Sequence, residues 1–116
     1  MKYITISEKY FNEICPNKNI VFCLSCKIGE IEFCKTLLSE YPEVDPSADN
    51  NKAFRLASEY GQIEVVKWLL QDERVNPFDD DNYAIRWATK NNHPDVVALI
   101  LNDPRMEASA FKYFTE

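Results

Sequence analysis

The chain repeats itself three times, and this internal repeat limits the available folds more than any other feature. The segments IVFCLSCKIGEIEFCKTLL, KAFRLASEYGQIEVVKWLL and YAIRWATKNNHPDVVALIL align without a gap. Gly29, Gly61 and Asn92 mark one position in the three units, 32 and then 31 residues apart, and the alignment places the extra residue in a loop at residues 39–43. A period of this length is typical of a solenoid, in which stacked units share one continuous core.

Each unit has the pattern of two short antiparallel helices. The apolar residues of the middle unit form two groups at helical spacing, namely Ala53, Phe54, Leu56 and Ala57, then Ile63, Val66, Leu69 and Leu70. Residues 49–51 are Asp, Asn and Asn, which can cap the first helix. Gly61 tolerates the left-handed backbone that the reversal between the helices requires, and Pro94 suits a first helical turn. Helices this short are marginal alone, so stacking must stabilise them.

The segment GQIEVVKWLL, residues 61–70, resembles the Gly-His-x-Glu-Val-Val-Lys-x-Leu-Leu signature of the ankyrin repeat family. The resemblance covers residues 19–107 and implies an all-α, ankyrin-type solenoid of stacked antiparallel helix pairs. It also implies finger loops, a concave face formed by these loops and the first helices, and a role in binding other proteins without catalysis. Residues 20–23, 52–55 and 83–86 replace the family's Thr-Pro-Leu-His motif, so its usual Thr and His hydrogen bonds are missing. The short period predicts shorter fingers.

We predict a single domain over residues 1–116. Its parts are an N-terminal cap (1–18), repeat 1 (19–50), repeat 2 (51–81), repeat 3 (82–108) and a C-terminal half-repeat cap (109–116). The half-repeat is inferred from SAFKYFTE, which echoes KAFRLASE of the middle unit. In the N-terminal cap, Ser7 can begin a helix whose apolar side is Tyr10, Phe11, Ile14 and Cys15.

Charge and hydropathy narrow the class of partner. The net charge of −6 argues against nucleic acid, because a phosphate-binding surface needs Lys and Arg to displace condensed counterions. No segment approaches the roughly 20 apolar residues of a membrane span, and polar residues interrupt the N-terminal segment where a secretory signal would be apolar. We therefore expect an intracellular, cytoplasmic protein that contacts neither nucleic acid nor membrane.

Three features of the sequence are candidate sites of chemistry, namely the cysteines, the single histidine and an acidic run. Cys23 and Cys26 alone have the spacing of zinc ligands, and they fall inside a helical pattern, so reduced thiols are favoured, with Cys26 and Cys34 buried. His93 has no recognisable partner for general-base catalysis. The acidic run at residues 79–81 lacks the alternating oxygens, Gly and closing Glu of a calcium loop. We predict no catalytic residue, no metal and no cofactor.

The family resemblance places the candidate partner-binding residues on the concave face, namely Asp49, Asn51, Glu59, Tyr60, Asp79, Asp80, Asn82, Lys90 and Asn91. Positions with a structural role repeat between units, whereas residues 27–28, 59–60 and 90–91 differ in every unit, which supports a binding role. We predict that Tyr60 is a contact centre and that the carboxylates of Asp79 and Asp80 steer a partner with a basic surface. Unconstrained solvated positions would vary in the same way, so that alternative stays open.

Two further expectations concern packing and assembly. Trp68 and Trp87 fall on helices of the repeat and are expected to pack in the core or between units rather than to form ligand cages. We expect a monomer that binds another protein. The alternative is a structural protein that self-associates through the ends of its stack.

Overall fold

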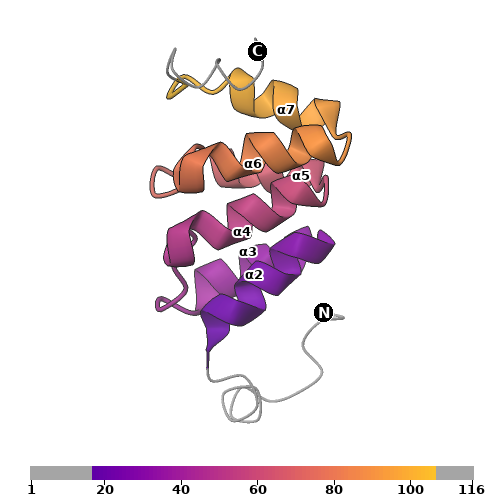
Figure 1. Ribbon diagram of the computed structural model, residues 1–116. Helices are drawn as coiled ribbons and strands as arrows, with labels where there is room; N and C mark the ends of the chain where they lie inside the picture. The colour runs from indigo at the N-terminus through magenta and orange to yellow at the C-terminus, as the bar shows by residue number, and fades with distance from the viewer. Residues whose placement is uncertain (1–16, 107–116) are drawn as a thin grey trace.

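Six α-helices make up the part of the chain that the computed structural model describes, residues 17–106 (Figure 1). They are α2 (Lys18–Ile28), α3 (Ile31–Glu40), α4 (Ala48–Glu59), α5 (Ile63–Leu70), α6 (Asp79–Lys90) and α7 (Pro94–Leu101). No strand occurs within these residues, and no described helix is long and apolar enough to cross a membrane. Residues 1–16 of the predicted N-terminal cap, including Cys15, and the predicted half-repeat lie outside the described residues.

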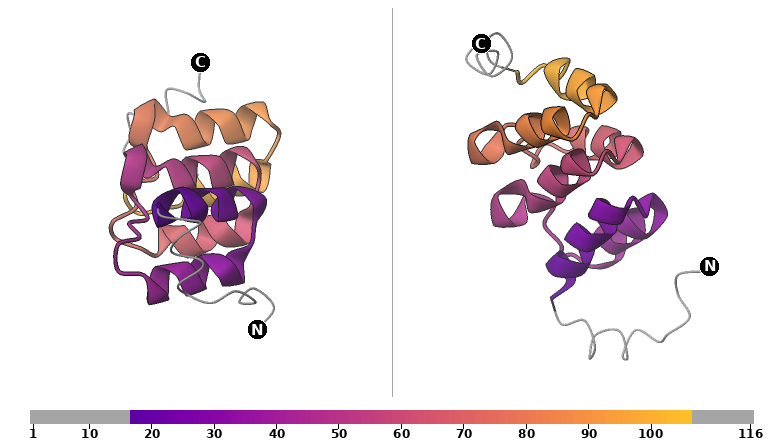
Figure 2. Two further views of the ribbon diagram at one scale, coloured as in Figure 1. Left: turned by 90° about the horizontal axis from the view of Figure 1, so that it is seen from below. Right: turned by 45° about the vertical axis from the view of Figure 1, so that its right-hand side comes forward.

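Consecutive helices form pairs, and the pairs stack in two layers. The pairs are α2 with α3, α4 with α5 and α6 with α7. The first helices, α2, α4 and α6, pack side by side as a first-helix layer, while the second helices lie behind it (Figure 1; two further views in Figure 2). This arrangement confirms the predicted all-α solenoid of stacked antiparallel helix pairs.

The core repeats with the sequence. Phe22, Phe54 and Ile85 occupy the same position in the three first helices, and each is fully buried. Leu37, Leu69 and Ile100 do the same in the second helices. The side chain of Trp68 is partly buried against this core, with its ring centroid 6.1 Å from that of Phe22, so the packing role predicted for it is confirmed.

The reversals inside each pair use the predicted left-handed residues. The φ angles of Gly29, Gly61 and Asn92 are 84°, 72° and 62°. A Cβ added to Gly61 would lie 2.6 Å from the Cε1 and Nδ1 atoms of His93, so this turn requires glycine for space as well as for conformation. His93 thus packs over the turn of the preceding unit. Pro94 begins α7, as predicted.

One sequence-based assignment, the Ser39–Glu43 loop, is wrong in its first part. Ser39 and Glu40 are the last two residues of α3, whereas α5 and α7 end at the positions equivalent to Leu38. The Ser39 hydroxyl donates to the carbonyl oxygen of Thr36 at 3.1 Å. The extra residue of the first unit is therefore accommodated mainly by a longer second helix.

Candidate interaction surface

The finger turns that enter α4 and α6 have a left-handed backbone. Asp49, Asn50 and Asn51 have φ angles of 57°, 57° and 59°, and residues 80–82 have nearly the same values. Asp and Asn are the non-glycine residues that tolerate this conformation best. The sequence assigned residues 49–51 to a helix cap, but they form a left-handed turn within the bounds of α4, and the right-handed part of the helix follows them.

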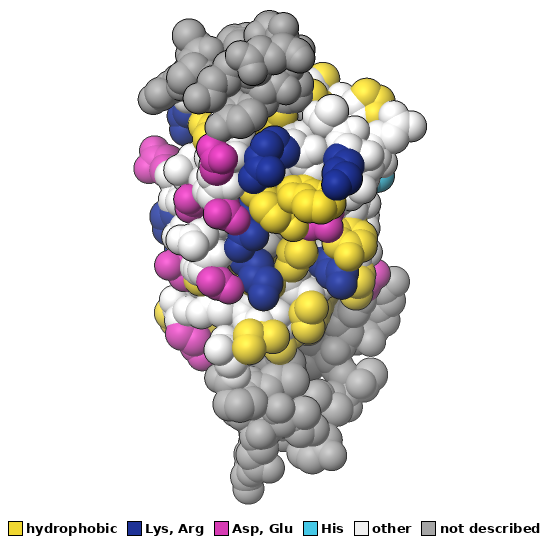
Figure 3. All heavy atoms as spheres, viewed as in Figure 1, with side chains coloured by type: hydrophobic (Ala, Val, Ile, Leu, Met, Phe, Trp, Pro, Cys, Tyr) yellow, Lys and Arg dark blue, Asp and Glu magenta, His cyan; other side chains and the backbone are white. Residues whose placement is uncertain are grey.

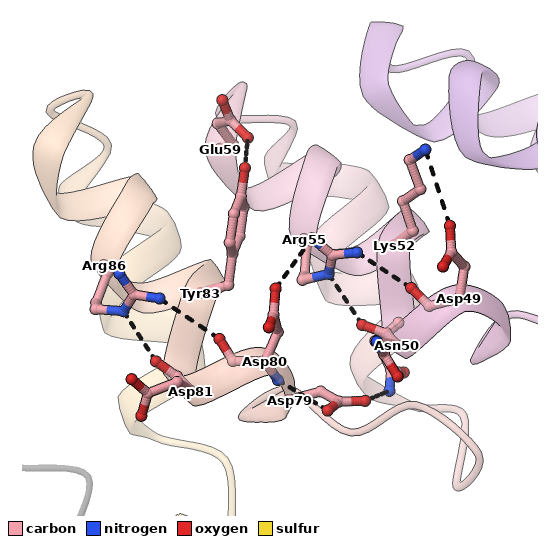
Figure 4. A network of polar contacts seen from close by, with 11 residues as sticks. Asp49, Asn50, Lys52, Arg55, Glu59, Asp79, Asp80, Asp81, Tyr83 and Arg86 are labelled. Carbon is pink, nitrogen blue, oxygen red and sulfur yellow. Dashed lines mark hydrogen bonds and ion pairs between the residues drawn. The ribbon is translucent and has the colours of Figure 1, made fainter.

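An arginine on α4 and another on α6 each hold the finger turn of their own helix in place (Figure 4). Arg55 donates from Nε to the carbonyl oxygen of Asn50 at 2.9 Å and from Nη2 to that of Asp49 at 3.1 Å. Arg86 makes the equivalent bonds to the carbonyl oxygens of Asp81 and Asp80, at 2.8 and 3.5 Å. These arginines occupy the position of the His in Thr-Pro-Leu-His, so guanidinium groups provide finger contacts in its absence.

Two equivalent asparagines connect successive fingers. Asn19 accepts from the backbone N–H of Asp45 at 2.8 Å, and Asn51 accepts from that of Asn76 at 2.9 Å. Asn51 also donates from Nδ2 to the Asp79 carboxylate at 2.8 Å. The third asparagine of this series is Asn82, whose Oδ1 atom is buried without a partner among the described residues.

The exposed side of the first-helix layer, here named the inner face, is built from residues four apart on each helix. Its rows are Ile20, Leu24 and Ile28 on α2, Lys52, Leu56 and Tyr60 along α4, and Tyr83, Trp87 and Asn91 along α6. Side chains at this spacing point to the same side of a helix. A groove between α2 and α4 is lined in part by Ile20, Leu24, Lys52 and Leu56.

Cations stack on aromatic rings across this face. Nζ of Lys27 lies 4.9 Å from the ring centroid of Tyr60, which connects the first unit to the second. The Arg55 guanidinium lies 4.9 Å from the ring centroid of Tyr83, which connects the second unit to the third. Nζ of Lys90 lies 4.7 Å from the Trp87 ring centroid. All three distances are within the range of a favourable cation–π contact.

Tyr83 is fixed at the centre of this arrangement. Its hydroxyl donates to the Glu59 carboxylate at 2.5 Å, and its ring lies 5.7 Å from that of Trp87. Burial, followed by the hydrogen bond and the charge of Glu59, raises the pKa of Tyr83 to about 12. The phenol therefore stays protonated and held by Glu59 over the physiological pH range.

Basic and acidic side chains are unevenly distributed on this side of the molecule. Figure 3 shows Lys and Arg side chains interspersed with hydrophobic ones over the first-helix layer, and most of the visible carboxylates along the edge of the finger turns. Asp49 and Asp79–Asp81 belong to that edge. Among the described residues no carboxylate forms an ion pair with Lys27 or Lys90. Apolar and cationic side chains therefore predominate on the inner face although the chain is acidic, and the Glu59 carboxylate near its end is bound by the Tyr83 hydroxyl.

A family model described as ankyrin repeats, in three copies, matches residues 1–79 and 23–111 of this chain. The chain belongs to the ankyrin repeat family. No curated protein and no solved structure matches it. Ankyrin repeats are generally protein–protein interaction modules and are typically not catalytic.

The predicted site residues occupy three different parts of this ankyrin-repeat structure. Glu59, Tyr60, Lys90 and Asn91 lie at or near the end of the inner face next to the reversals, where the Asn91 side chain donates to the carbonyl oxygen of Glu59 at 3.0 Å. Asp49 and Asp80 are exposed in the finger turns. Asn51, Asp79 and Asn82 are buried or half-buried there.

Two of these residues do not suit the predicted contact role. Asn51 is 4% exposed, and both ends of its amide are used within the chain. The carboxylate of Asp79 accepts from Asn51 and from the backbone N–H of Asp80. Asn51 and Asp79 therefore position the finger, since their polar groups are already engaged.

Sequence reasoning did not include most of the inner face among the candidate residues. The omitted residues are Ile20, Leu24, Lys27, Ile28, Lys52, Arg55, Leu56, Tyr83, Arg86 and Trp87. A signal for the arginines was present, because Asp49-Asn50-Asn51 and Asp80-Asp81-Asn82 are each followed four residues later by Arg. The packing predicted for Trp87 is only partly right, since its half-buried ring lies between Tyr83 and Lys90 on the inner face.

The described thiols are buried in the core. Cys26 and Cys34 are both fully buried, as predicted, and their Sγ atoms are 3.5 Å apart. The hydrogen bond between them, together with burial, raises the pKa of Cys26, so the thiol form is favoured. Within residues 17–106 no group of three or more His, Cys, Asp or Glu side chains is arranged to hold a metal ion.

Proposed function

We propose that this protein is a non-catalytic binding module and that a partner protein docks on its inner face. The observation that carries the proposal is the set of cation–aromatic contacts that joins all three units on one exposed side. Tyr, Trp and Arg are the residues most enriched among energetically dominant interface contacts. A surface that presents all three types supports the assignment of this face.

The rings are held before any partner arrives, which favours binding. Tyr60 is 48% exposed with Lys27 over its ring, and Tyr83 is held by Glu59. Side chains that are already ordered lose little conformational entropy on association, so more of the contact free energy contributes to affinity. Tyr and Trp also bury a large area for few rotatable bonds.

The finger carboxylates support steering of a basic partner less well than the sequence suggested. The Asp80 carboxylate lies 3.4 Å from Nη1 of Arg55, and that of Asp79 is engaged within its own finger. The Asp80 charge is therefore paired within the chain, and the Asp79 oxygens are held by neutral donors of its own finger. We propose that these residues fix finger geometry and that the inner face provides the main contact.

Affinity capture from the native cell, quantified by mass spectrometry, tests the proposal. The bait variants are Tyr60→Ala and Trp87→Ala, with Lys67→Ala as a matched control on α5, outside the first-helix layer. The inner-face variants should capture less partner, because each should reduce the binding free energy by on the order of 1 to 2 kcal/mol or more, the loss typical of a central contact residue. The control should capture the partner like the wild type.

The opposite pattern would assign the site to the second helices. If Lys67→Ala reduces capture and both inner-face variants do not, the proposed face is wrong and the fold is unaffected. Circular dichroism of each variant shows whether its helices are intact.

We propose a monomer, so light scattering should give a mass that is independent of concentration. A mass that grows with concentration would favour self-association through the ends.

A further inference from the structure

The first unit presents the most apolar part of the inner face. Ile20, Leu24 and Ile28 are 57%, 51% and 64% exposed and follow one another along α2. The equivalent positions of the next unit are Lys52, Leu56 and Tyr60, two of which carry polar groups. Removing exposed aliphatic side chains from water is favourable, so a partner that covers them gains binding free energy. The row on α2 is therefore a candidate contact surface.

The groove beside this row offers space for a side chain. Its lining includes Ile20 and Leu24 from α2, Leu56 from α4, and Cys23. Cys23 is 8% exposed, and burial raises the pKa of its thiol, so the thiol stays uncharged at neutral pH. The charged residues of the lining, Asp49 and Lys52, are exposed and paired with each other, so an apolar side chain can enter beside Cys23 without leaving a buried charge unpaired.

Cations border the apolar row on the side of the second unit. Lys27 stacks on the Tyr60 ring and forms no ion pair with a described carboxylate. Lys52 lies on the groove and pairs with Asp49 at 3.9 Å, and the side chains of this pair are 48% and 69% exposed. An exposed pair at this distance is weak, so Lys52 can exchange it for a carboxylate of a ligand.

Resting on the proposed function, we propose that the partner contacts the first unit through an acidic amphipathic segment. Its apolar side chains lie along Ile20, Leu24 and Ile28 and enter the groove, while its Asp and Glu side chains pair with Lys27 and Lys52. The α2 row runs over residues 20–28, a rise of about 12 Å, which matches two to three turns of a ligand helix. Helices that dock in grooves commonly use apolar anchors at this spacing.

Selection from a displayed library of random peptides tests this ligand chemistry without a known partner. The full chain is immobilised at low salt, where charge selectivity is strongest, and peptides of about 14 residues cover three to four helical turns. The expected enriched peptides combine Leu, Ile or Phe with Asp and Glu. The strongest is then synthesised and titrated against variants by fluorescence anisotropy.

The variants separate the apolar from the charged contribution. Leu24→Ser should weaken the Kd roughly tenfold or more, as expected from the loss of a buried aliphatic side chain. Lys27→Glu should also weaken it, and added salt should weaken the wild-type complex. Lys67→Glu is the matched control, because Lys67 is 53% exposed on α5, and it should leave the Kd unchanged.

Three outcomes would overturn the inference. They are enrichment of Lys- and Arg-rich peptides, tighter binding by Lys27→Glu, and no enrichment above a blank surface. The proposed function fails on a different result, namely partner capture that is insensitive to Tyr60→Ala and Trp87→Ala. A captured partner that depends on those two residues, together with basic selected peptides, would retain the binding face and reject the acidic ligand.

Discussion

Arg55 is the side chain on which the geometry of two fingers depends, so its removal is a sharp test of the structure. Its guanidinium holds the carbonyl oxygens of Asp49 and Asn50, pairs with the Asp80 carboxylate of the next finger and stacks on Tyr83. The Arg55 side chain is 16% exposed. We predict that Arg55→Ala destabilises the protein and loosens the contact between the second and third units.

The expected size follows from the individual contacts. Each hydrogen bond to an exposed finger carbonyl contributes about 1 kcal/mol net, because water replaces the lost donor. The Asp80 side chain is 50% exposed, so its ion pair with Arg55 contributes about 0.5 kcal/mol after solvent screening. Stacking on Tyr83 adds about 0.5 kcal/mol. Arg55→Ala should therefore reduce the free energy of unfolding by about 3 kcal/mol, which lowers Tm by roughly 12 °C.

Urea denaturation followed by circular dichroism and Trp fluorescence measures this loss. Arg55→Lys keeps the charge but not the planar fork, so it should fall between the wild type and Arg55→Ala. The matched control is Arg74→Ala, because the Arg74 side chain pairs with Asp72 at 2.8 Å but is 53% exposed. That control should cost at most about 1 kcal/mol. A loss for Arg55→Ala no larger than for Arg74→Ala would refute the role assigned to Arg55.

Further predictions concern the core, a turn and the thiols. Leu69→Ala, at a fully buried position of the central unit, should cost roughly 2 to 5 kcal/mol in chemical denaturation, and an unchanged midpoint would contradict its place in the core. Gly61→Ala should lower Tm, since a left-handed alanine costs about 1 to 2 kcal/mol even before its Cβ meets His93. The pKa of Cys26 is raised in the folded state, so its contribution to stability is complete below the unfolded thiol pKa of about 8.5 and is lost at higher pH. Urea titrations at neutral and alkaline pH should show this loss as a lower free energy of unfolding. Cys34, fully buried beside it, should resist alkylation until the protein unfolds.

The fold could be predicted because its determinants repeat in the sequence. Gly29, Gly61 and Asn92 have a left-handed backbone, and Leu37 and Leu69 are buried, because equivalent positions of the units have the same backbone or packing requirement and are filled by residues that meet it. The length of α3 was not predictable in this way. Only the first unit has the extra residue, so no equivalent in the other units indicated whether it extends a helix or a loop.

The candidate site is harder to predict, because the family resemblance gives the position of a residue and not its exposure. The resemblance places Asn51 on the concave face, but Asn recurs at the equivalent positions 19 and 82, and the buried Asn51 amide connects two fingers. The apolar row on α2 was missed for the opposite reason. Ile20 and Leu24 look like core residues in a hydrophobic pattern, and only the stacking of the helices shows that they remain exposed.

The central claim, that the inner face binds the partner, is tested most directly by lysine labelling. Lys27, Lys52 and Lys90 belong to the first-helix layer, whereas Lys35 and Lys67 belong to α3 and α5. The free protein and its complex with the captured partner are each methylated reductively. Mass spectrometry then compares the reactivity of the five amines between the two samples. We predict that the partner protects Lys27, Lys52 and Lys90 and leaves Lys35 and Lys67 as reactive as before. Protection of Lys35 and Lys67 with unchanged labelling of the other three would contradict the account.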